Sequence, residues 1–122
     1  LDELGVVDAR HETMIEAALR ETREETGWDV RLTAFLGAYQ WKAPDLSEER
    51  PGRHYLRFAF AAEPDHHDPT RRLDEGIVQA LWLTPEELLA ARERHRSPLV
   101  WQVVEDHLAG RRSPLTVLQH LA

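Results

Sequence analysis

Residues 12–27 read ETMIEAALRETREETG, and this stretch predicts a single helix. Thr13 is one of the residue types that cap helix N-termini, and no Gly or Pro interrupts the segment from Met14 to Thr26. Gly27 follows directly, and glycine readily takes the left-handed conformation that ends a helix. We therefore expect a helix that begins after Thr13 and ends at Gly27.

The predicted helix has an apolar face and an acidic face. Its apolar stripe, which we expect to pack on the core, consists of Ile15, Ala18, Leu19 and Thr22. Three carboxylates at spacings i, i+3 and i+4 converge on another face: Glu21, Glu24 and Glu25. Like charges at this spacing destabilise a helix, and the negative end of the helix dipole lies in the same turns. A solvated acidic surface is one interpretation, and a site for a hard divalent cation such as Mg²⁺ or Mn²⁺ is the other.

The same stretch resembles the Nudix box, G-x5-E-x7-R-E-U-x-E-E-x-G-U, in which U is a bulky apolar residue. The positions that match are Glu12, Arg20, Glu21, Glu24, Glu25, Gly27 and Trp28. Thr22 is a polar substitute for the first bulky residue, and the glycine position falls on Val6, one residue after Gly5. The difference at the glycine position concerns the loop on the substrate side and not the helix that is expected to bind metal.

Segments beyond the box resemble one subgroup of this family, the phosphatase NudJ-like proteins. They are residues 39–41, 43–45, 55–58, 77, 81–83, 96–100, 110 and 114–115. The resemblance implies an α/β protein with the Nudix fold, an α/β/α sandwich around a mixed sheet, formed by one domain over residues 1–122. Nudix folds place sheet strands before the box, so we expect the N-terminal strands to be missing from this sequence.

The resemblance also implies hydrolysis of phosphoanhydride bonds with the help of Mg²⁺ or Mn²⁺. The implied substrates are nucleoside tri- and diphosphates or a pyrimidine diphosphate precursor of thiamine. The metal ligands are then Glu21, Glu24 and Glu25, and the last two are also the first candidates for the general base, with Glu75 as a distant alternative. A catalytically weak Nudix-like module that binds a nucleotide without cleaving it is the second hypothesis.

Two further box residues have open roles. We expect Arg20 to hold Glu21 or Glu24 in a fixed rotamer, although a surface ion pair of little consequence is the competing interpretation. Glu12 matches a family position near the metal, and it could also cap the helix.

The rest of the chain predicts strands, polar loops and short helices. Strands are expected at residues 30–41, with a bulge at Gly37, and at 54–62 and 77–83; polar loops are expected at 42–53 and 63–74. Thr84 with Pro85 and Glu87 forms a capping box that starts a helix, and Ser97–Pro98 and Ser113–Pro114 open two more helical segments. The adjacent His66 and His67 point in different directions and are not expected to bind metal.

Three residues of the predicted strands are candidates for contacts to the substrate. Alternation along a strand places Tyr39 and Trp41 on the same face, where they could stack on a base or sugar or belong to the core. Arg57 is the candidate for phosphate. Stacking accepts any base, so we expect little discrimination between purines and pyrimidines.

Composition limits the class of protein further. The chain has 122 residues, 42% of them hydrophobic, which is enough for one domain with its own core. Its net charge of -7 argues against binding to nucleic acid or to an anionic membrane. Cysteine is absent and no apolar run reaches the roughly 20 residues of a membrane span. We therefore expect a cytoplasmic monomer or homodimer that acts on a small nucleotide or diphosphate.

Overall fold

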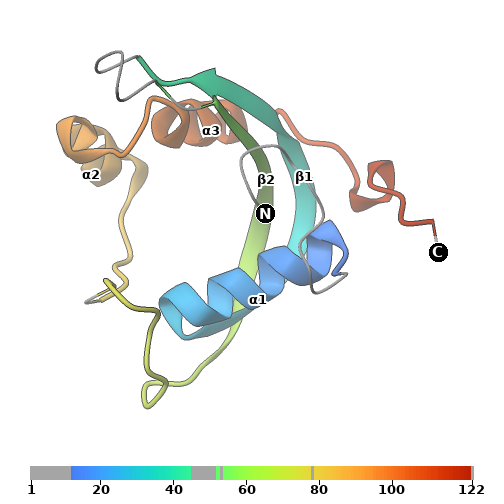
Figure 1. Ribbon diagram of the computed structural model, residues 1–122, viewed down its shortest axis with the longest axis vertical. Helices are drawn as coiled ribbons and strands as arrows, with labels where there is room; N and C mark the ends of the chain where they lie inside the picture. Colours follow the sequence, from blue (N-terminus) through green and yellow to red (C-terminus); the bar gives the residue numbers. More distant parts are fainter. Residues whose placement is uncertain (1–11, 45–51, 53, 78, 122) are drawn as a thin grey trace.

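The computed structural model of the chain describes residues 12–44, 52, 54–77 and 79–121. Its elements are α1 (Met14–Thr26), β1 (Trp28–Lys42), β2 (His54–His67), α2 (Pro85–Ala90), the 3-10 helix η1 (Arg92–Arg94), α3 (Leu99–Leu108) and the 3-10 helix η2 (Leu115–Val117) (Figure 1). Helices together with an antiparallel sheet confirm the predicted α/β class. The Gly5–Val6 position and most of the loop predicted at 42–53 lie outside the described residues.

Helix α1 begins and ends as its sequence predicts. The Thr13 hydroxyl accepts a hydrogen bond from the Glu16 N–H at 3.1 Å, and the Glu16 carboxylate accepts one from the Thr13 N–H at 3.1 Å. Gly27 has a φ of 77°, and its N–H donates to the carbonyl of Arg23 at 2.9 Å. This left-handed residue turns the chain directly into β1.

Thr22, the polar residue at a bulky apolar position of the box, is tolerated for a local reason. Its hydroxyl donates to the carbonyl of Ala18 at 2.7 Å, one helical turn earlier. The hydroxyl is therefore not left unpaired where the helix packs on the sheet.

Strands β1 and β2 pair antiparallel along their whole lengths, from Trp28 opposite His67 to Lys42 opposite His54. One of the register shifts lies between Phe35 and Gly37, which confirms the predicted bulge at Gly37. Residues 63–67, which the sequence predicted as part of a polar loop, continue β2 instead. That prediction was wrong because strand formation here depends on a distant partner, residues 28–31 of β1, and the Trp28 and His67 rings stack with centroids 4.7 Å apart.

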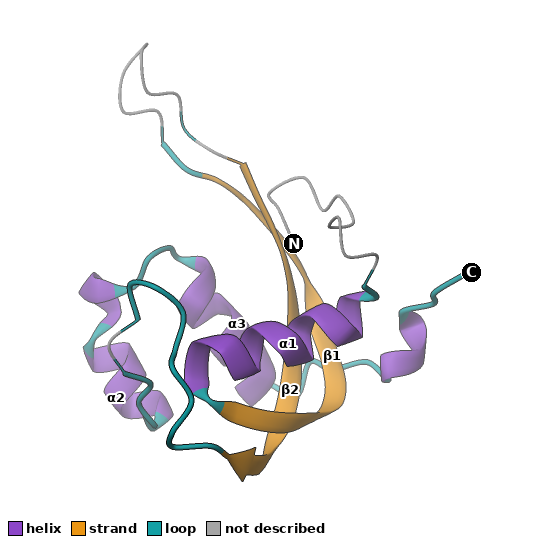
Figure 2. Cartoon of the chain, turned by 60° about the horizontal axis from the view of Figure 1, so that its bottom comes forward, coloured by secondary structure: helices purple, strands orange, loops and turns teal. Residues whose placement is uncertain are grey.

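Helices α1 and α3 both pack against β1. Figure 1 shows α3 beside the upper end of the two strands and α1 across their lower end, and Figure 2 shows α1 lying over the strands in a second view. Ala34, in the part of β1 between these contacts, is only 5% exposed. The two helices thereby pack toward opposite ends of the same strand.

We expected residues 77–83 to form a strand, and this is wrong for 77 and 79–83, which the structure describes. The N–H of Ile77 instead closes a turn with the carbonyl of Asp74 at 3.0 Å. An apolar segment forms a strand only where a neighbouring strand accepts its backbone hydrogen bonds. The described sheet consists of β1 and β2 alone, so Leu81 and Trp82 stay 67% and 70% exposed.

The C-terminal half follows its capping signals. Thr84 and Glu87 form the predicted capping box of α2, with hydrogen bonds of 3.0 and 3.1 Å. Helix α3 starts after Pro98, and η2 starts after Pro114, as predicted. Ser113 forms an isolated bridge with Phe35, exchanging backbone hydrogen bonds of 2.8 and 2.7 Å with it. None of the described helices is both long and apolar enough to cross a membrane.

Candidate active site

Arg20 on α1 lies among three carboxylates. Its Nε donates to both carboxylate oxygens of Glu12 at 2.9 Å, and its Nη1 donates to Oε2 of Glu24 at 2.8 Å. Its Nη2 lies 3.6 Å from Oε1 of Glu21. The hydrogen bond with Glu12, ahead of the charges of the three carboxylates, raises the pKa of Arg20, so the guanidinium stays cationic. The predicted contact between Arg20 and Glu24 is present, and Glu12 lies with Arg20 rather than at the helix cap.

Glu25 has a different environment from Glu24. Its side chain is exposed, yet neighbouring atoms remove part of its hydration, and this desolvation raises the pKa of the Glu25 carboxyl. The charges of Glu21 and Asp74 raise the pKa further, while those of Arg96 and Arg57 oppose the rise. Glu25 therefore stands where negative charge is in excess and where two arginines approach.

The α1 carboxylates supply the oxygen donors that Mg²⁺ and Mn²⁺ prefer. Within the described residues, no three His, Cys, Asp or Glu side chains are close enough together to hold a metal ion. The three carboxylates Glu21, Glu24 and Glu25 are thus not gathered at one point as predicted, and Glu24 forms an ion pair with Arg20. The donor chemistry and the excess of negative charge around Glu25 nevertheless fit a hard divalent cation.

A cleft of about 400 Å³ lies at the end of the sheet nearest α3. Its lining residues are Trp41, Tyr55, Arg57, Arg96 and Ser97. Trp41 and Tyr55 are cross-strand partners whose rings stack with centroids 5.6 Å apart, and the Arg57 guanidinium lies 5.5 Å from the Tyr55 ring. Two of the three predicted substrate contacts, Trp41 and Arg57, thus line one cleft. An aromatic pair beside cationic groups suits a flat ring that carries phosphate.

Tyr39, the third predicted substrate contact, has a structural partner. Its hydroxyl donates to Oδ2 of Asp106 on α3 at 2.8 Å, and Nε2 of Gln102 donates to Oδ1 of the same carboxylate at 3.1 Å. Tyr39 is not among the residues that line the cleft around Trp41. Desolvation, and then the hydrogen bond to Asp106, raise the pKa of Tyr39. Alternation along β1 did place Tyr39 on the face of Trp41, but helix α3 takes up its hydroxyl.

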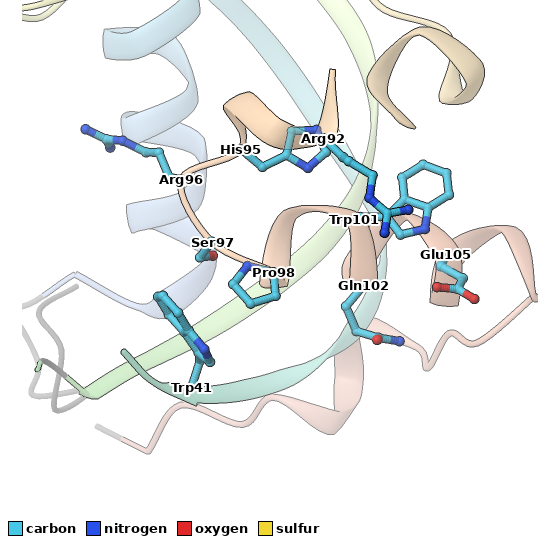
Figure 3. Close-up of a pocket in the computed structure, with 9 residues that line it drawn as sticks. All are labelled: Trp41, Arg92, His95, Arg96, Ser97, Pro98, Trp101, Gln102 and Glu105. Carbon is cyan, nitrogen blue, oxygen red and sulfur yellow. The ribbon is translucent and has the colours of Figure 1, made fainter. Parts of the chain in front are cut away.

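The segment between η1 and α3 supplies two cleft residues, Arg96 and Ser97, to which the sequence analysis gave no role in the site. Arg96 and Ser97 line the cleft and also a larger cavity, of about 730 Å³, that adjoins it at Trp41. Figure 3 shows the other residues around that cavity: Arg92, His95, Pro98, Trp101, Gln102 and Glu105. The signal for this segment was present in the sequence, since residues 96–100 carried part of the family resemblance.

Asp74 is a carboxylate near α1 that the sequence analysis did not assign to the site. Its N–H donates to the carbonyl of Glu24 at 3.0 Å, so the chain after β2 returns to the last turn of α1. Its neighbour Glu75, the distant candidate for the general base, lines a separate cavity of about 770 Å³ beside Trp28 and Trp82. Of these two neighbours, Asp74 is the one whose charge acts on Glu25, beside that of Glu21.

The chain is similar in sequence and in fold to known proteins. The family described as NUDIX domain matches residues 4–102. Phosphatase NudJ of Escherichia coli (strain K12) and that of Shigella flexneri are each 38% identical over 107 residues, 88% of this chain and 65% of theirs. The solved structure of a NUDIX hydrolase from Nitrosomonas europaea superposes with a TM-score of 0.80 at 41% identity, covering 90% of this chain and 71% of that one.

The chain thus spans 65% of the length of the curated relatives that it matches. The fold of the solved neighbour confirms the expected Nudix fold. The box residues lie at their required spacing on α1, the family matches most of the chain, and the solved neighbour has the same fold. The chain therefore belongs to the Nudix family.

Proposed function

We propose that this protein is a hydrolase that cleaves phosphoanhydride bonds in nucleoside tri- or diphosphates, or in a pyrimidine diphosphate, with Mg²⁺ or Mn²⁺ as cofactor. The observation that carries the proposal is the position of the box helix. Its last turn carries Glu25, whose carboxyl pKa is raised by desolvation and lowered in part by the charges of Arg96 and Arg57, and both of these arginines line the cleft that holds the stacked aromatic rings. The names of the relatives, a phosphatase and a hydrolase, support the same reaction class.

The proposed metal ligands are Glu21, Glu24 and Glu25. When bound, the cation supplies positive charge to phosphate oxygens and makes water more acidic. Arg20 has a positioning role, because its hydrogen bonds to Glu12 and Glu24 fix the rotamer of Glu24.

Between the two candidates for the general base, the surroundings favour Glu25 over Glu24. The Glu24 carboxylate already accepts a hydrogen bond from Arg20, whereas desolvation raises the pKa of the Glu25 carboxyl and makes Glu25 the better proton acceptor. Arg57 attracts the phosphates and Trp41 stacks on the base or sugar. A small phosphate compound in the cytoplasm is the partner that we propose.

The variant Glu24→Gln tests the proposal, because it removes one ligand charge and keeps the shape of the side chain. Phosphate release from a panel of nucleotides and diphosphates at saturating Mg²⁺ should fall by about 100-fold or more. Glu86→Gln on α2, an exposed carboxylate away from the cleft, is the matched control and should keep wild-type turnover. Circular dichroism should show equal helix content in all three proteins. Near-normal turnover of Glu24→Gln would show that Glu24 is not a metal ligand.

A module that binds a nucleotide without cleaving it is the second candidate. The observation in its favour is that, among the described residues, the carboxylates are not gathered into a metal-binding group. Calorimetry with a nonhydrolysable nucleotide and Mg²⁺, run beside a phosphate-release assay, separates the two. Tight binding without release over hours would favour the module.

A further inference from the structure

Gln102 on α3 stands between a buried carboxylate and a cavity. Its Nε2 donates a hydrogen bond to Oδ1 of Asp106 at 3.1 Å. Gln102 is nevertheless exposed, and it lines the cavity of about 730 Å³ that adjoins the cleft at Trp41. Figure 3 shows Gln102 and Glu105 extending from α3 at this cavity. The amide of Gln102 is thus held by the protein on one side and accessible to a ligand on the other.

The carboxylate of Asp106 determines how this amide is turned. An ionised carboxylate only accepts hydrogen bonds, so the NH2 group of Gln102 has to face it. Asp106 is 8% exposed, and its Oδ2 already accepts a hydrogen bond from the Tyr39 hydroxyl at 2.8 Å. Reversing the amide would set its oxygen against Oδ1 of Asp106, and two acceptors in contact are unfavourable where hydration is mostly lost. The carbonyl oxygen of Gln102 is therefore left as an acceptor for a ligand in the cavity.

A second acceptor lies on the same wall of the cavity. Glu105 is three residues further along α3, so it shares a helix face with Gln102, and it too is exposed and lines the cavity. Its carboxylate accepts hydrogen bonds and donates none. The cationic donors around this cavity, Arg92 and Arg96, come from the chain before α3. The wall formed by α3 therefore suits a ligand group that donates hydrogen bonds.

Trp41 connects this wall with the cleft. It lines both the cleft and the cavity, and its ring stacks on that of Tyr55 with centroids 5.6 Å apart. A base that stacks on Trp41 in the cleft turns an edge toward the adjoining cavity. An amino group on this edge would meet the acceptors of α3, whereas a carbonyl group would meet oxygen atoms that cannot donate to it.

We propose that Gln102, oriented by Asp106, makes the site prefer bases with an exocyclic amino group, such as cytosine, to bases with a carbonyl group at that position, such as uracil. The inference rests on the proposed function, because it assumes that the base of the substrate stacks on Trp41. The ring N–H of uracil lies between two carbonyl groups, so bringing it to Gln102 also brings a carbonyl oxygen toward Glu105. Because both side chains are exposed to water, the preference is limited to about threefold to tenfold.

The test compares two ligands that differ only at the edge of the base. They are α,β-methylene-CDP and α,β-methylene-UDP, which cannot be hydrolysed at their bridge, and calorimetry with Mg²⁺ measures their dissociation constants. The wild type should bind the cytosine compound about threefold to tenfold more tightly than the uracil compound. Gln102→Leu keeps a side chain of similar size without its amide. This variant should bring the two dissociation constants to within about 1.5-fold of each other.

Two control variants separate this contact from a general effect on the structure. Gln40→Leu replaces an exposed glutamine of β1 that lines neither the cleft nor the cavity, and it should keep the wild-type preference. Tyr39→Phe removes one hydrogen bond from Asp106 and leaves the bond from Gln102 in place. Its preference should therefore persist even if the protein is less stable. Melting curves confirm that each variant is folded.

The orienting role of Asp106 is tested by Asp106→Asn. An amide at this position can donate to the Gln102 oxygen as well as accept from its NH2 group, so the Gln102 amide is no longer fixed in one direction. The preference for the cytosine compound should fall toward that of Gln102→Leu, and an unchanged preference would overturn the orienting role. Gln102→Leu tests the contact with the base even if Asp106→Asn does not fold.

The inference is overturned if the wild type binds the two ligands equally, binds the uracil compound more tightly, or binds neither measurably. The same preference in Gln102→Leu as in the wild type would also overturn it. The hydrolase proposal fails separately. If the wild type releases no phosphate from any compound while the preference depends on Gln102, the reaction is wrong and the contact with the base stands. If the wild type is active and binds both ligands equally, the contact is wrong and the reaction stands.

Discussion

The hydroxyl of Tyr39 on β1 donates a hydrogen bond to the carboxylate of Asp106 on α3 at 2.8 Å, across the contact between sheet and helix. Asp106 is only 8% exposed, and it also accepts a hydrogen bond from Gln102. A carboxylate in such surroundings depends on its donors, because its hydration is mostly lost. This pair holds α3, and with it the segment that carries Arg96, against the sheet.

Removing the Tyr39 hydroxyl should therefore destabilise the protein. Tyr39→Phe should lower the free energy of unfolding by about 1–3 kcal/mol at pH 7, measured by urea denaturation. Tyr55→Phe is the matched control and should change it by less than about 0.5 kcal/mol. Equal effects of the two variants would show that the Asp106 contact carries no stability.

The hydrogen bond between Tyr39 and Asp106 also makes the free energy of unfolding depend on pH in the alkaline range. The folded-state pKa of Tyr39 is raised above the usual value of about 10, so its contribution to stability is fully present below that value. It is lost as pH rises through the raised pKa, because the unfolded chain ionises more readily. The stability difference between wild type and Tyr39→Phe should thus be constant between about pH 7 and 9 and shrink above about pH 10. Urea denaturation of both proteins across this pH range measures the difference. A difference that stays constant above about pH 10 would show that ionisation of Tyr39 does not affect stability.

The positioning role of Arg20 predicts an effect on turnover. Arg20→Lys keeps the charge but loses the planar guanidinium whose Nε and Nη1 donate to Glu12 and Glu24 in fixed directions, so Glu24 loses its fixed rotamer. We expect kcat to fall by about tenfold or more with a smaller change in KM. Arg23→Lys, one turn further along α1, is the control, because Arg23 pairs with Asp29. An unchanged kcat in Arg20→Lys would show that the contact between Arg20 and Glu24 is only a surface ion pair.

If the base of the substrate stacks on Trp41, the protein should hydrolyse nucleotides with different bases at similar rates. Purine and pyrimidine nucleotides should have kcat/KM values within about tenfold of each other, because any base presents a flat ring. Trp41→Ala should raise KM for all of them by a similar factor and change kcat less. Trp82→Ala, at an exposed position outside the cleft, should leave the kinetics unchanged. A hundredfold preference for one base would indicate that Gln102 or Glu105, in the adjoining cavity, reads its edge.

Gly27 and Gly110 allow backbone strain to be separated from steric overlap. Both have positive φ angles, 77° and 83°. A Cβ atom at Gly27 would lie 3.2 Å from the carbonyl oxygen of Asp68, whereas one at Gly110 would meet nothing within 4 Å. Gly110→Ala should destabilise by about 1–2 kcal/mol through the left-handed conformation alone, and Gly27→Ala should destabilise by more. Equal losses in thermal denaturation would show that Asp68 moves away freely.

The features that the sequence predicted correctly are local ones. The capping boxes of Thr13 and Thr84 and the stop at Gly27 involve residues within four positions of each other. Such hydrogen bonds form wherever the helix forms, so spacing alone identifies them. The contact between Arg20 and Glu24, four residues apart, belongs to the same class.

The features that the sequence did not predict depend on distant partners. Residues 63–67 become a strand only because residues 28–31 pair with them, and residues 77 and 79–83 do not become one because the described sheet gives them no partner. Arg96 lines the same cleft as Arg57 because α3 packs on β1. The pattern of apolar residues within either segment does not predict this contact. Tyr39 likewise was assigned to the substrate because Asp106 is far along the chain.

The bridge between Phe35 and Ser113 lies at the middle of β1, on the edge that faces away from β2. A strand edge with a continuous row of free N–H and C=O groups can pair with the same edge of another molecule, which leads to aggregation. Ser113 occupies the central positions of that row and divides it into two short lengths. By pairing with Phe35, the segment after α3 shortens the strand edge with which another molecule could pair.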